Sequence, residues 1–203
     1  MTRVVLASAN PGKLREFAAL LAPFAVQLVP QAELGIRPAV ETGTTFLENA
    51  LIKSHHAARH AHLPAIADDS GLEVEALGGR PGVWSARFAG AAASDEENLR
   101  HLLAELHDVP DEFRQARYQC VIVFVRSVGD QTPLIARGTW PGNIAHTPRG
   151  QGGFGYDPVF VPAGERRSAA ELASAEKNAV SHRGQALRAL VAMLESQGYI
   201  RTP

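Results

Sequence analysis

The sequence contains little cysteine and no long apolar run. Its single cysteine, Cys120, excludes an internal disulfide framework, and its apolar neighbours predict a buried core residue rather than a nucleophile. The most apolar run, residues 17–29, is short and is interrupted by Pro23 and Gln27, so no membrane-spanning segment is expected. The apolar stretch near the N-terminus is too brief for a signal peptide. We therefore expect a cytoplasmic protein without a membrane partner.

Neither sign of charge is in excess, since 20 Lys and Arg stand against 21 Asp and Glu. This balance does not favour sequence-independent binding to nucleic acid, and no nucleic-acid partner is expected. Lysine is scarce among the cations: only Lys13, Lys53 and Lys177 are lysines, and the rest are arginines. Because a compact ammonium and a planar guanidinium suit different ligands, each of these lysines is a candidate binding residue.

Strands and helices alternate along the chain, which predicts an α/β fold. The hydrophobic pattern predicts strands over 3–8, 24–29, 64–68, 72–76, 116–128, 132–145 and 158–161. Helices are expected after Asn10, over 44–61, after Ser94 and after Ser181. No repeat or linker interrupts residues 1–203, so we expect a single domain.

Residues 8–13, Ser-Ala-Asn-Pro-Gly-Lys, join the first expected strand to the first helix. Free backbone N–H groups and the positive end of the helix dipole make such a loop a natural anion site. Lys13 in the first helical turn opposes the dipole, so its position is easier to explain if an anion lies beside it. An ordinary capped turn is the alternative interpretation.

Residues 41–50, Glu-Thr-Gly-Thr-Thr-Phe-Leu-Glu-Asn-Ala, lead into the second expected helix. At helical spacing Asn49 and Lys53 share a polar face opposite Phe46 and Ala50. A polar face is usually solvated. Lys53 on this face, with Glu41 just ahead of the helix, indicates a binding role as the alternative.

The segment Asp68-Asp69-Ser70-Gly71 gives the most specific indication of a functional site. We expect these two carboxylates at the end of a short apolar strand, where the chain leaves the sheet. Their mutual repulsion needs a cation or a shared proton to relieve it. Oxygen ligands at a strand end suit Mg²⁺, which is completed by water and substrate phosphates. A solvated turn is the alternative.

Residues 150–158, Gly-Gln-Gly-Gly-Phe-Gly-Tyr-Asp-Pro, contain a G-x-G-x-x-G pattern. A strand rather than a helix is expected after it, so dinucleotide binding, and with it a nicotinamide-dependent oxidoreductase, is rejected. The glycines would instead let the backbone approach a ligand and present Phe154 and Tyr156, whose rings can stack on a base. A glycine-rich hinge or hairpin is the alternative.

Near the C-terminus, Lys177 is followed by Ser181-His182-Arg183-Gly184-Gln185. Two potential cations in the first turn of a helix are unfavourable unless an electron-rich group lies there. A keto oxygen or a phosphate would serve.

Taken in order, these segments resemble the inosine/xanthosine triphosphate pyrophosphatase family. The resemblance covers nearly the whole chain and is carried by E-T-G-x-T-F-x-E-N-A, D-D-S-G-L, G-F-G-Y-D-P and S-H-R-G. It implies an elongated mixed central sheet flanked by helices, with two lobes, the active site in the cleft between them, and a homodimer. It also implies Mg²⁺-dependent hydrolysis of dITP/ITP and XTP/dXTP to nucleoside monophosphate and pyrophosphate, which cleanses the nucleotide pool.

The resemblance further implies roles for individual residues. Asp69 is the favoured catalytic base, with Asp68 as a supporting carboxylate, and Glu41 and Asp69 hold Mg²⁺. The triphosphate is bound by Ser8, Asn10, Lys13 and Lys53. The nucleoside site is lined by Ser70, Phe154, Gly155, Tyr156 and Asp157, and the base is contacted by Lys177, His182 and Arg183.

Two other functions stay open on the sequence. A related pyrophosphatase for modified pyrimidine nucleotides could share the architecture, and a non-catalytic nucleotide sensor could share the binding residues. The adjacent Asp68 and Asp69 favour an enzyme, because carboxylates repel phosphate unless a metal intervenes. A donor-only group such as Arg183 or Lys177 favours a 6-keto purine over adenine, because adenine presents a donor at position 6.

Overall fold

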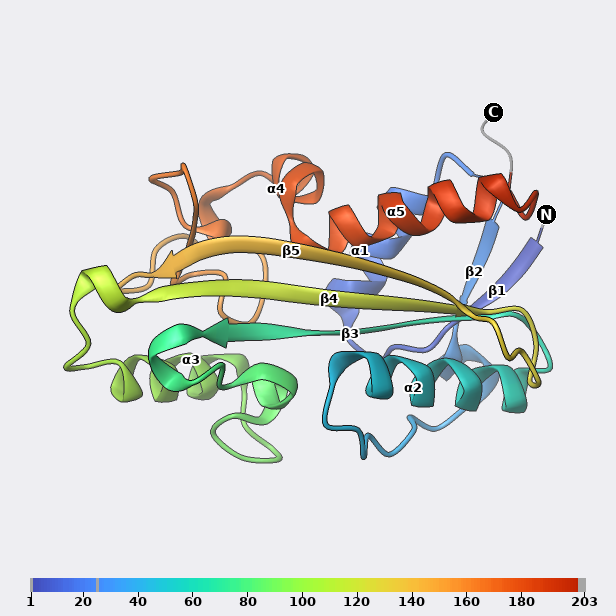
Figure 1. Cartoon of the computed structure of the whole chain (residues 1–203), viewed down its shortest axis with the longest axis horizontal. Helices are drawn as coiled ribbons and strands as arrows, with labels where there is room; N and C mark the ends of the chain where they lie inside the picture. Colours follow the sequence, from blue (N-terminus) through green and yellow to red (C-terminus); the bar gives the residue numbers. More distant parts are fainter. Residues whose placement is uncertain (1, 25, 201–203) are drawn as a thin grey trace. The chain divides into compact units, whose positions relative to one another are not determined.

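The computed structural model describes residues 2–24 and 26–200 and contains helices and strands in alternation (Figure 1). The strands are β1 Thr2–Leu6, β2 Val26–Pro30, β3 Ala65–Val74, β4 Gln115–Val125, β5 Leu134–Ile144 and β6 Phe160–Pro162. The helices are α1 Pro11–Leu21, α2 Phe46–Ala61, α3 Asp95–Glu105, α4 Ser174–Val180 and α5 His182–Ser196. No helix in this described part is long and apolar enough to cross a membrane.

The six strands form one sheet in the order β2-β1-β3-β4-β5-β6. β1 is parallel to both of its neighbours, with Val5 opposite Val29 in β2 and opposite Ala65 in β3. At the other end of the order β6 is antiparallel to β5, with Asn143 opposite Val161. The fold is therefore a mixed α/β sheet flanked by helices, as the alternating pattern predicted.

The chain divides into two compact units, and the division falls inside β3, β4 and β5. The first unit takes the chain up to Asp69, residues 120–138, and the chain from Arg183 onward. The second takes residues 70–119 and 139–182. Each unit has a hydrophobic core of its own.

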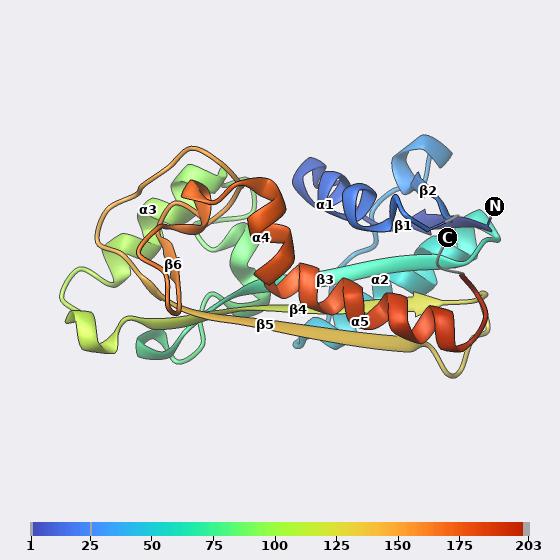
Figure 2. The ribbon, with the colours of Figure 1, turned by 90° about the horizontal axis from the view of Figure 1, so that it is seen from above.

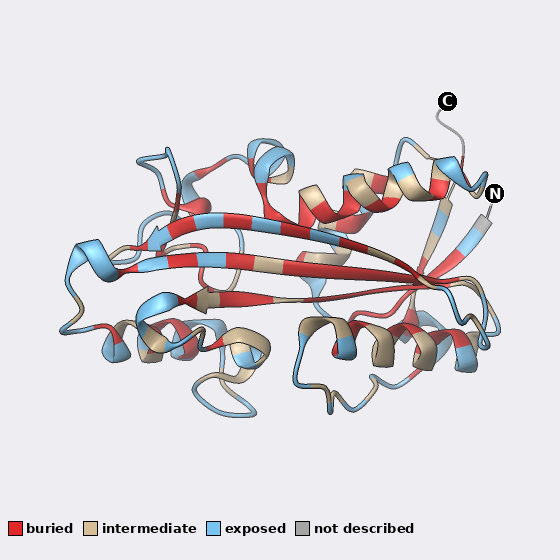
Figure 3. Cartoon of the chain, in the orientation of Figure 1, coloured by how far each residue is buried: buried red, intermediate tan, exposed pale blue. Residues whose placement is uncertain are grey.

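In the first unit the helices cover both faces of the strands (Figures 1 and 2). Successive strand residues point to opposite faces, so Leu6 and Ile66 pack with α1 and α5, whereas Val5 and Ala65 pack with α2. Because both faces are covered, the first-unit parts of β1, β3 and β4 are mostly buried (Figure 3), and their sequences there are nearly continuous apolar runs rather than alternating ones.

The second unit has a core rich in aromatic residues. Leu72 and Val74 of β3 pack with Leu102 of α3. Tyr118, Trp140 and Phe160 belong to the same cluster, and the ring centroids of Tyr118 and Phe160 are 4.7 Å apart in an edge-on arrangement.

Local capping signals correctly located the starts of α1 and α3. Asn10 accepts hydrogen bonds from the backbone N–H groups of Gly12 and Lys13 at the start of α1. Ser94 forms the predicted capping box with Glu97 at the start of α3. The prediction that Cys120 is a core residue is also confirmed, because it is buried and burial raises the pKa of its thiol to about 12.

Two predictions of secondary structure are wrong. The separate strands expected over 64–68 and 72–76 are one strand, β3, which continues through Asp68 and Asp69 without a turn. The short helix α4 was not predicted, and Ser181 stands between α4 and α5. Residue 25, inside the expected strand 24–29, lies outside the described residues.

Candidate active site

Asp68 and Asp69 lie side by side in the middle of β3, and both are buried. Because a strand alternates its side chains, Asp68 lies on the same face as Ile66, toward α1 and α5, whereas Asp69 lies on the same face as Ala67, toward α2. The pleat of the strand thus separates two neighbouring negative charges, and each can take a different set of partners.

Two cations hold the carboxylate of Asp68. Its Oδ2 atom lies 2.8 Å from Lys13 Nζ and accepts hydrogen bonds from Arg183 Nε and Nη2 at 3.3 Å. Burial raises the pKa of Asp68, but the charges of Lys13, Arg183 and Lys53 outweigh burial and hold this pKa well below its usual value. Asp68 is therefore ionised at neutral pH.

Lys13 and Arg183 both stand in the first turn of a helix, where the helix dipole opposes a positive charge. Asp68 lies beside both, and Arg183 Nη1 also pairs with Glu16. Burial lowers the pKa of Arg183, but the two carboxylates outweigh it and raise this pKa. The anion that these positions call for is thus supplied by the chain itself.

The carboxylate of Asp69 has a different environment. Its Oδ1 atom accepts a hydrogen bond from Lys53 Nζ at 2.7 Å, and its Oδ2 atom accepts one from Asn49 Nδ2 at 3.3 Å. Burial raises the pKa of Asp69 and outweighs the opposing effect of Lys53. A buried carboxylate with a raised pKa is suited to the role of general base.

Lys53 is shared between two carboxylates, since its Nζ atom also lies 3.0 Å from Glu41 Oε1. Burial lowers the pKa of Lys53, but Asp69, Asp68 and Glu41 outweigh burial and raise it, so the side chain is an ammonium. Two carboxylates thus converge on one cationic position.

Glu41 and Asp69 suit a magnesium ion by the chemistry of their donors. Mg²⁺ is commonly held by one or two carboxylates together with water and substrate phosphates. Among the described residues no group of three or more His, Cys, Asp or Glu side chains is arranged to hold a metal. A metal at this pair would therefore draw its remaining ligands from water and substrate.

The predicted phosphate-binding residues Ser8 and Asn10 lie in the loop between β1 and α1, and Lys13 follows in the first turn of α1. Asn10 Oδ1 accepts from Gly12 N at 2.8 Å and from Lys13 N at 3.1 Å, and Ser8 Oγ accepts from Asn10 N at 3.2 Å. The loop is therefore built by its own polar side chains, and it places Lys13 against Asp68. Phosphate binding by Ser8 and Asn10 stays a prediction.

In the second unit, Asp157 fixes the loop that carries Phe154. Its Oδ2 atom accepts from Phe154 N at 2.9 Å and from Lys177 Nζ at 2.6 Å. Lys177 Nζ also lies 4.9 Å from the centre of the Phe154 ring. Gly153 has a φ of +73°, and a Cβ atom there would collide with the Asp157 carboxylate. This glycine therefore permits close packing of the chain against itself.

The neighbouring residues of this loop are also anchored within the second unit. Gly155 N donates to Asp95 Oδ2 at 2.7 Å, and the buried Tyr156 donates its hydroxyl to Ser85 O at 2.8 Å. Ser70 is half-buried in β3. That Ser70 and residues 154–157 line a nucleoside site stays a prediction.

His182 is buried in an aromatic stack. Its ring lies parallel to that of Tyr118, with centroids 4.6 Å apart, and the Trp140 ring lies beside this pair, 6.3 Å from His182 and 6.4 Å from Tyr118. Arg183, the next residue, belongs to the first unit with Asp68. Contact of Lys177, His182 and Arg183 with a base stays a prediction.

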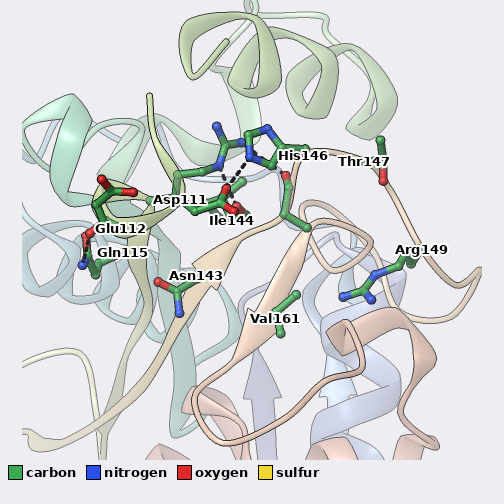
Figure 4. A pocket seen from close by; sticks show the side chains of 11 residues that line it. Asp111, Glu112, Gln115, Asn143, Ile144, His146, Thr147, Arg149 and Val161 are labelled. Carbon is green, nitrogen blue, oxygen red and sulfur yellow. Dashed lines mark hydrogen bonds and ion pairs between the residues drawn. The ribbon is translucent and has the colours of Figure 1, made fainter. Parts of the chain in front are cut away.

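A cavity of about 530 Å³ in the second unit contains none of the predicted site residues (Figure 4). Asp111, His146 and Arg149 are among its lining side chains, and Asp111 and His146 are paired with each other. Arg114 also lines it and donates to the carbonyl oxygens of Ile144 and Leu106. None of the predicted catalytic, metal-binding or substrate-binding residues therefore lines this cavity.

Three residues contact the predicted site residues, and the sequence analysis did not identify these contacts. Asn49 was placed on the polar face of α2 but was not singled out. Glu16 lies three residues after Lys13, and nothing local indicated that it would meet Arg183. Asp95 is the first residue of α3, and no local signal indicated that its carboxylate would accept from Gly155 N.

A model of the Ham1 family matches residues 4–193. The chain belongs to the Ham1 family. It is 57% identical over 191 residues to the dITP/XTP pyrophosphatase of Yersinia pseudotuberculosis, covering 94% of this chain and 97% of the relative. It is 54% identical over 196 residues to the dITP/XTP pyrophosphatase of Escherichia coli K12, covering 97% and 100%.

Solved structures agree with this membership. The HAM1 protein of Coxiella burnetii matches this Ham1-family chain with a TM-score of 0.89 and 47% identity, covering 97% of this chain and 100% of that one. The Mycobacterium abscessus structure named a nucleoside-triphosphatase and dITP/XTP pyrophosphatase matches with a TM-score of 0.75 and 46% identity, covering 93% and 98%. The resemblance inferred from the motifs is thereby confirmed.

Proposed function

We propose that this Ham1-family chain hydrolyses dITP and XTP, together with ITP and dXTP, to nucleoside monophosphate and pyrophosphate. The observation that carries the substrate class is the identity of 54–57% over nearly the whole chain to proteins named dITP/XTP pyrophosphatase. Such hydrolysis would remove deaminated purines before they enter DNA or RNA. The alternatives, a pyrimidine-nucleotide pyrophosphatase and a non-catalytic sensor, receive no support from these names.

Asp69 is the general base of the proposed reaction. Phosphoryl transfer needs little covalent help, so catalysis rests on positioning and on neutralising charge. The buried Asp69 takes a proton from the attacking water, and its raised pKa makes it the better base of the two aspartates. Lys13 and Lys53 neutralise phosphate oxygens with ammonium groups that β3 and Glu41 hold in place before substrate binds.

Glu41 and Asp69 are the residues that would hold Mg²⁺. The support is their convergence on the single ammonium of Lys53, which marks a cationic position between two hard oxygen donors. When bound there, the ion supplies further charge neutralisation to the phosphates. Lys53, which contacts both carboxylates, would direct its ammonium to a phosphate oxygen of the substrate.

Recognition of the base is assigned to the second unit's loop and to Lys177. Phe154 offers a half-buried ring for stacking, and Lys177, which donates to Asp157, carries an ammonium that can only donate hydrogen bonds. A 6-keto oxygen accepts from such a donor, whereas the amino group of adenine would leave it unpaired. A mismatch of this kind at a polar site can discriminate by a factor on the order of 10⁴.

Product analysis tests this proposal. Incubation of the protein with ITP and Mg²⁺ should yield IMP and pyrophosphate, and the products IDP and phosphate would contradict it. The same assay with dITP, XTP, dTTP, UTP and dATP tests the substrate class, and a preference for the pyrimidine nucleotides would overturn it. Removal of Mg²⁺ with a chelator should stop product formation, and unchanged turnover would exclude the ion as a cofactor.

The protein is further proposed to be a cytoplasmic homodimer, as the family resemblance implies. Light scattering on the purified chain should give twice the mass of 21.7 kDa, and a monomer mass would contradict the dimer. Fractionation of cells should place the chain with cytoplasmic markers.

A further inference from the structure

We propose that Asn49 is a positioning residue for this reaction, whose side-chain amide joins the Asp69 carboxylate to the loop that carries Glu41. The inference rests on the proposed function, because it assigns Asp69 the task of activating water. Asn49 does not contact the reacting atoms in this assignment. It acts through the two segments that it connects.

Both polar atoms of the Asn49 side-chain amide form hydrogen bonds, and the side chain is fully buried. Nδ2 donates to Asp69 Oδ2 at 3.3 Å, and Oδ1 accepts from Gly43 N at 2.8 Å. These partners fix which end is which, since a carboxylate can only accept and a backbone N–H can only donate. A flipped amide would face both partners with the wrong group.

Gly43 is required for this connection. A Cβ atom at residue 43 would lie 2.6 Å from Glu48 Cβ and 2.7 Å from Asn49 Oδ1, so any larger residue would push the loop away from α2. The next residue is held too, because Thr44 N donates to Glu48 Oε2 at 2.7 Å. The loop two residues beyond Glu41 is therefore fastened to the helix that also carries Asn49.

The two oxygens of Asp69 consequently have different partners. Oδ2 is bound by a neutral amide that is buried in the helix face, whereas Oδ1 is bound by Lys53, a flexible ammonium that a phosphate can draw away. Asn49 thus keeps the carboxylate oriented when Lys53 leaves and presents Oδ1 to the water. A neutral donor does this without adding a second positive charge, which would make Asp69 a weaker base.

Asn49→Ala and Asn49→Asp test this role, with Ser54→Ala as the matched control. Ser54 is buried on the same helix, and its hydroxyl donates only within the helix, to Leu51 O. We expect kcat for dITP to fall about ten- to a hundredfold in both Asn49 variants, because each loses a buried hydrogen bond to a charged group. KM should change less than about threefold, because the phosphate-binding lysines are untouched. Ser54→Ala should leave both constants within about twofold.

A second readout does not depend on activity. The chain has five asparagines and eight glutamines, so its side-chain amides are few enough to resolve by ¹⁵N-edited NMR. In Asp69→Asn the Asn49 amide signals should shift, because a carboxylate acceptor is replaced by a neutral one, whereas those of Asn98, bonded to Ala86 and Ala89, should not.

Failure of the role of Asn49 can be distinguished from failure of the proposed function. A wild-type protein that does not hydrolyse dITP would remove the proposed function. An active wild type whose Asn49→Ala variant keeps its kcat within twofold, or an Asn49 signal that ignores Asp69→Asn, would overturn the role of Asn49. The NMR comparison decides the matter if an Asn49 variant fails to fold.

Discussion

The two faces of β3 shift the pKa values of two adjacent aspartates in opposite directions. On the face toward α1 and α5, Asp68 meets Lys13 and Arg183, and its pKa is held below the usual value. On the face toward α2, Asp69 shares Lys53 with Glu41, and its pKa is raised by burial. The same type of side chain, one residue apart, is held as an anion on one face and has a raised pKa on the other.

The difference teaches how a buried strand can contain two carboxylates. Asp68 is compensated by two cations, so its charge belongs to the folded structure. Asp69 is only partly compensated, which is unfavourable for stability but leaves a reactive group. The predictions below test this division of roles, starting from the largest expected effect.

Asp69→Asn should lower kcat for dITP about 10²–10⁴-fold, which is the usual contribution of a general base. Binding should persist, because the ammonium groups of Lys13 and Lys53 stay in place. Steady-state kinetics measure the first effect, and the rise in Tm on adding dITP measures the second. Turnover equal to that of the wild type would remove Asp69 from the chemistry.

Arg183→Gln should lower the free energy of unfolding by about 3 kcal/mol, because it removes one partner of a buried ion pair. Urea unfolding measures this loss. Arg117→Gln is the control, since Arg117 is half-exposed and pairs with Glu73 at 2.7 Å, and its loss should stay below about 1 kcal/mol. Equal losses in the two variants would show that the Asp68 face does not depend on its buried pair.

The pH dependence of stability should have opposite signs for the two aspartates. The pKa of Asp68 is lower in the folded chain than the unfolded value of about 3.9, so its contribution is full above that pH and is lost as the pH falls through the folded value. The pKa of Asp69 is higher in the folded chain, so its ionisation lowers stability as the pH rises above about 3.9.

Urea unfolding of the wild type and of each Asp→Asn variant between pH 3 and pH 7 measures these slopes. The free energy of unfolding of the wild type should exceed that of Asp68→Asn by an amount that shrinks toward low pH. Relative to that of Asp69→Asn, the free energy of unfolding of the wild type should fall as the pH rises toward neutral. Two differences that do not vary with pH would contradict the assignment.

Lysine-to-arginine exchange should give the smallest effects, and they should differ between the faces. Lys53 Nζ lies within 3.0 Å of two carboxylates, a position that suits a compact ammonium better than a planar guanidinium. We expect kcat to fall about tenfold in Lys53→Arg and KM to rise only about threefold in Lys13→Arg. Equal effects on both constants would mean that the two lysines serve the same role.

Local signals in the sequence were enough to predict most elements. Asn10 and Ser94 marked helix starts because capping depends on side chains a few residues apart. The strand end expected at Asp68 and Asp69 was wrong, because the cations that allow the strand to continue are remote: Arg183 is 115 residues from Asp68. Helix α4 was missed because seven residues give too short a pattern.

The candidate site was predicted in part for the same reason. The motifs named Lys13, Glu41, Lys53 and Asp69, and the structure brings the last three together. The role of Asn49 was not visible, because a polar stripe on a helix does not reveal which of its members meets a carboxylate from another element. Which cation serves which aspartate likewise depends on the pleat of a strand whose length was misjudged.

The free energies of unfolding of Asp68→Asn and Asp69→Asn, measured side by side at pH 7, test the division between the two faces most directly. Asp68→Asn should lose about 3 kcal/mol, because it leaves buried cations without their anion. Asp69→Asn should be as stable as the wild type or more so, because its ionised form is disfavoured by burial. Equal destabilisation of the two variants would contradict the account.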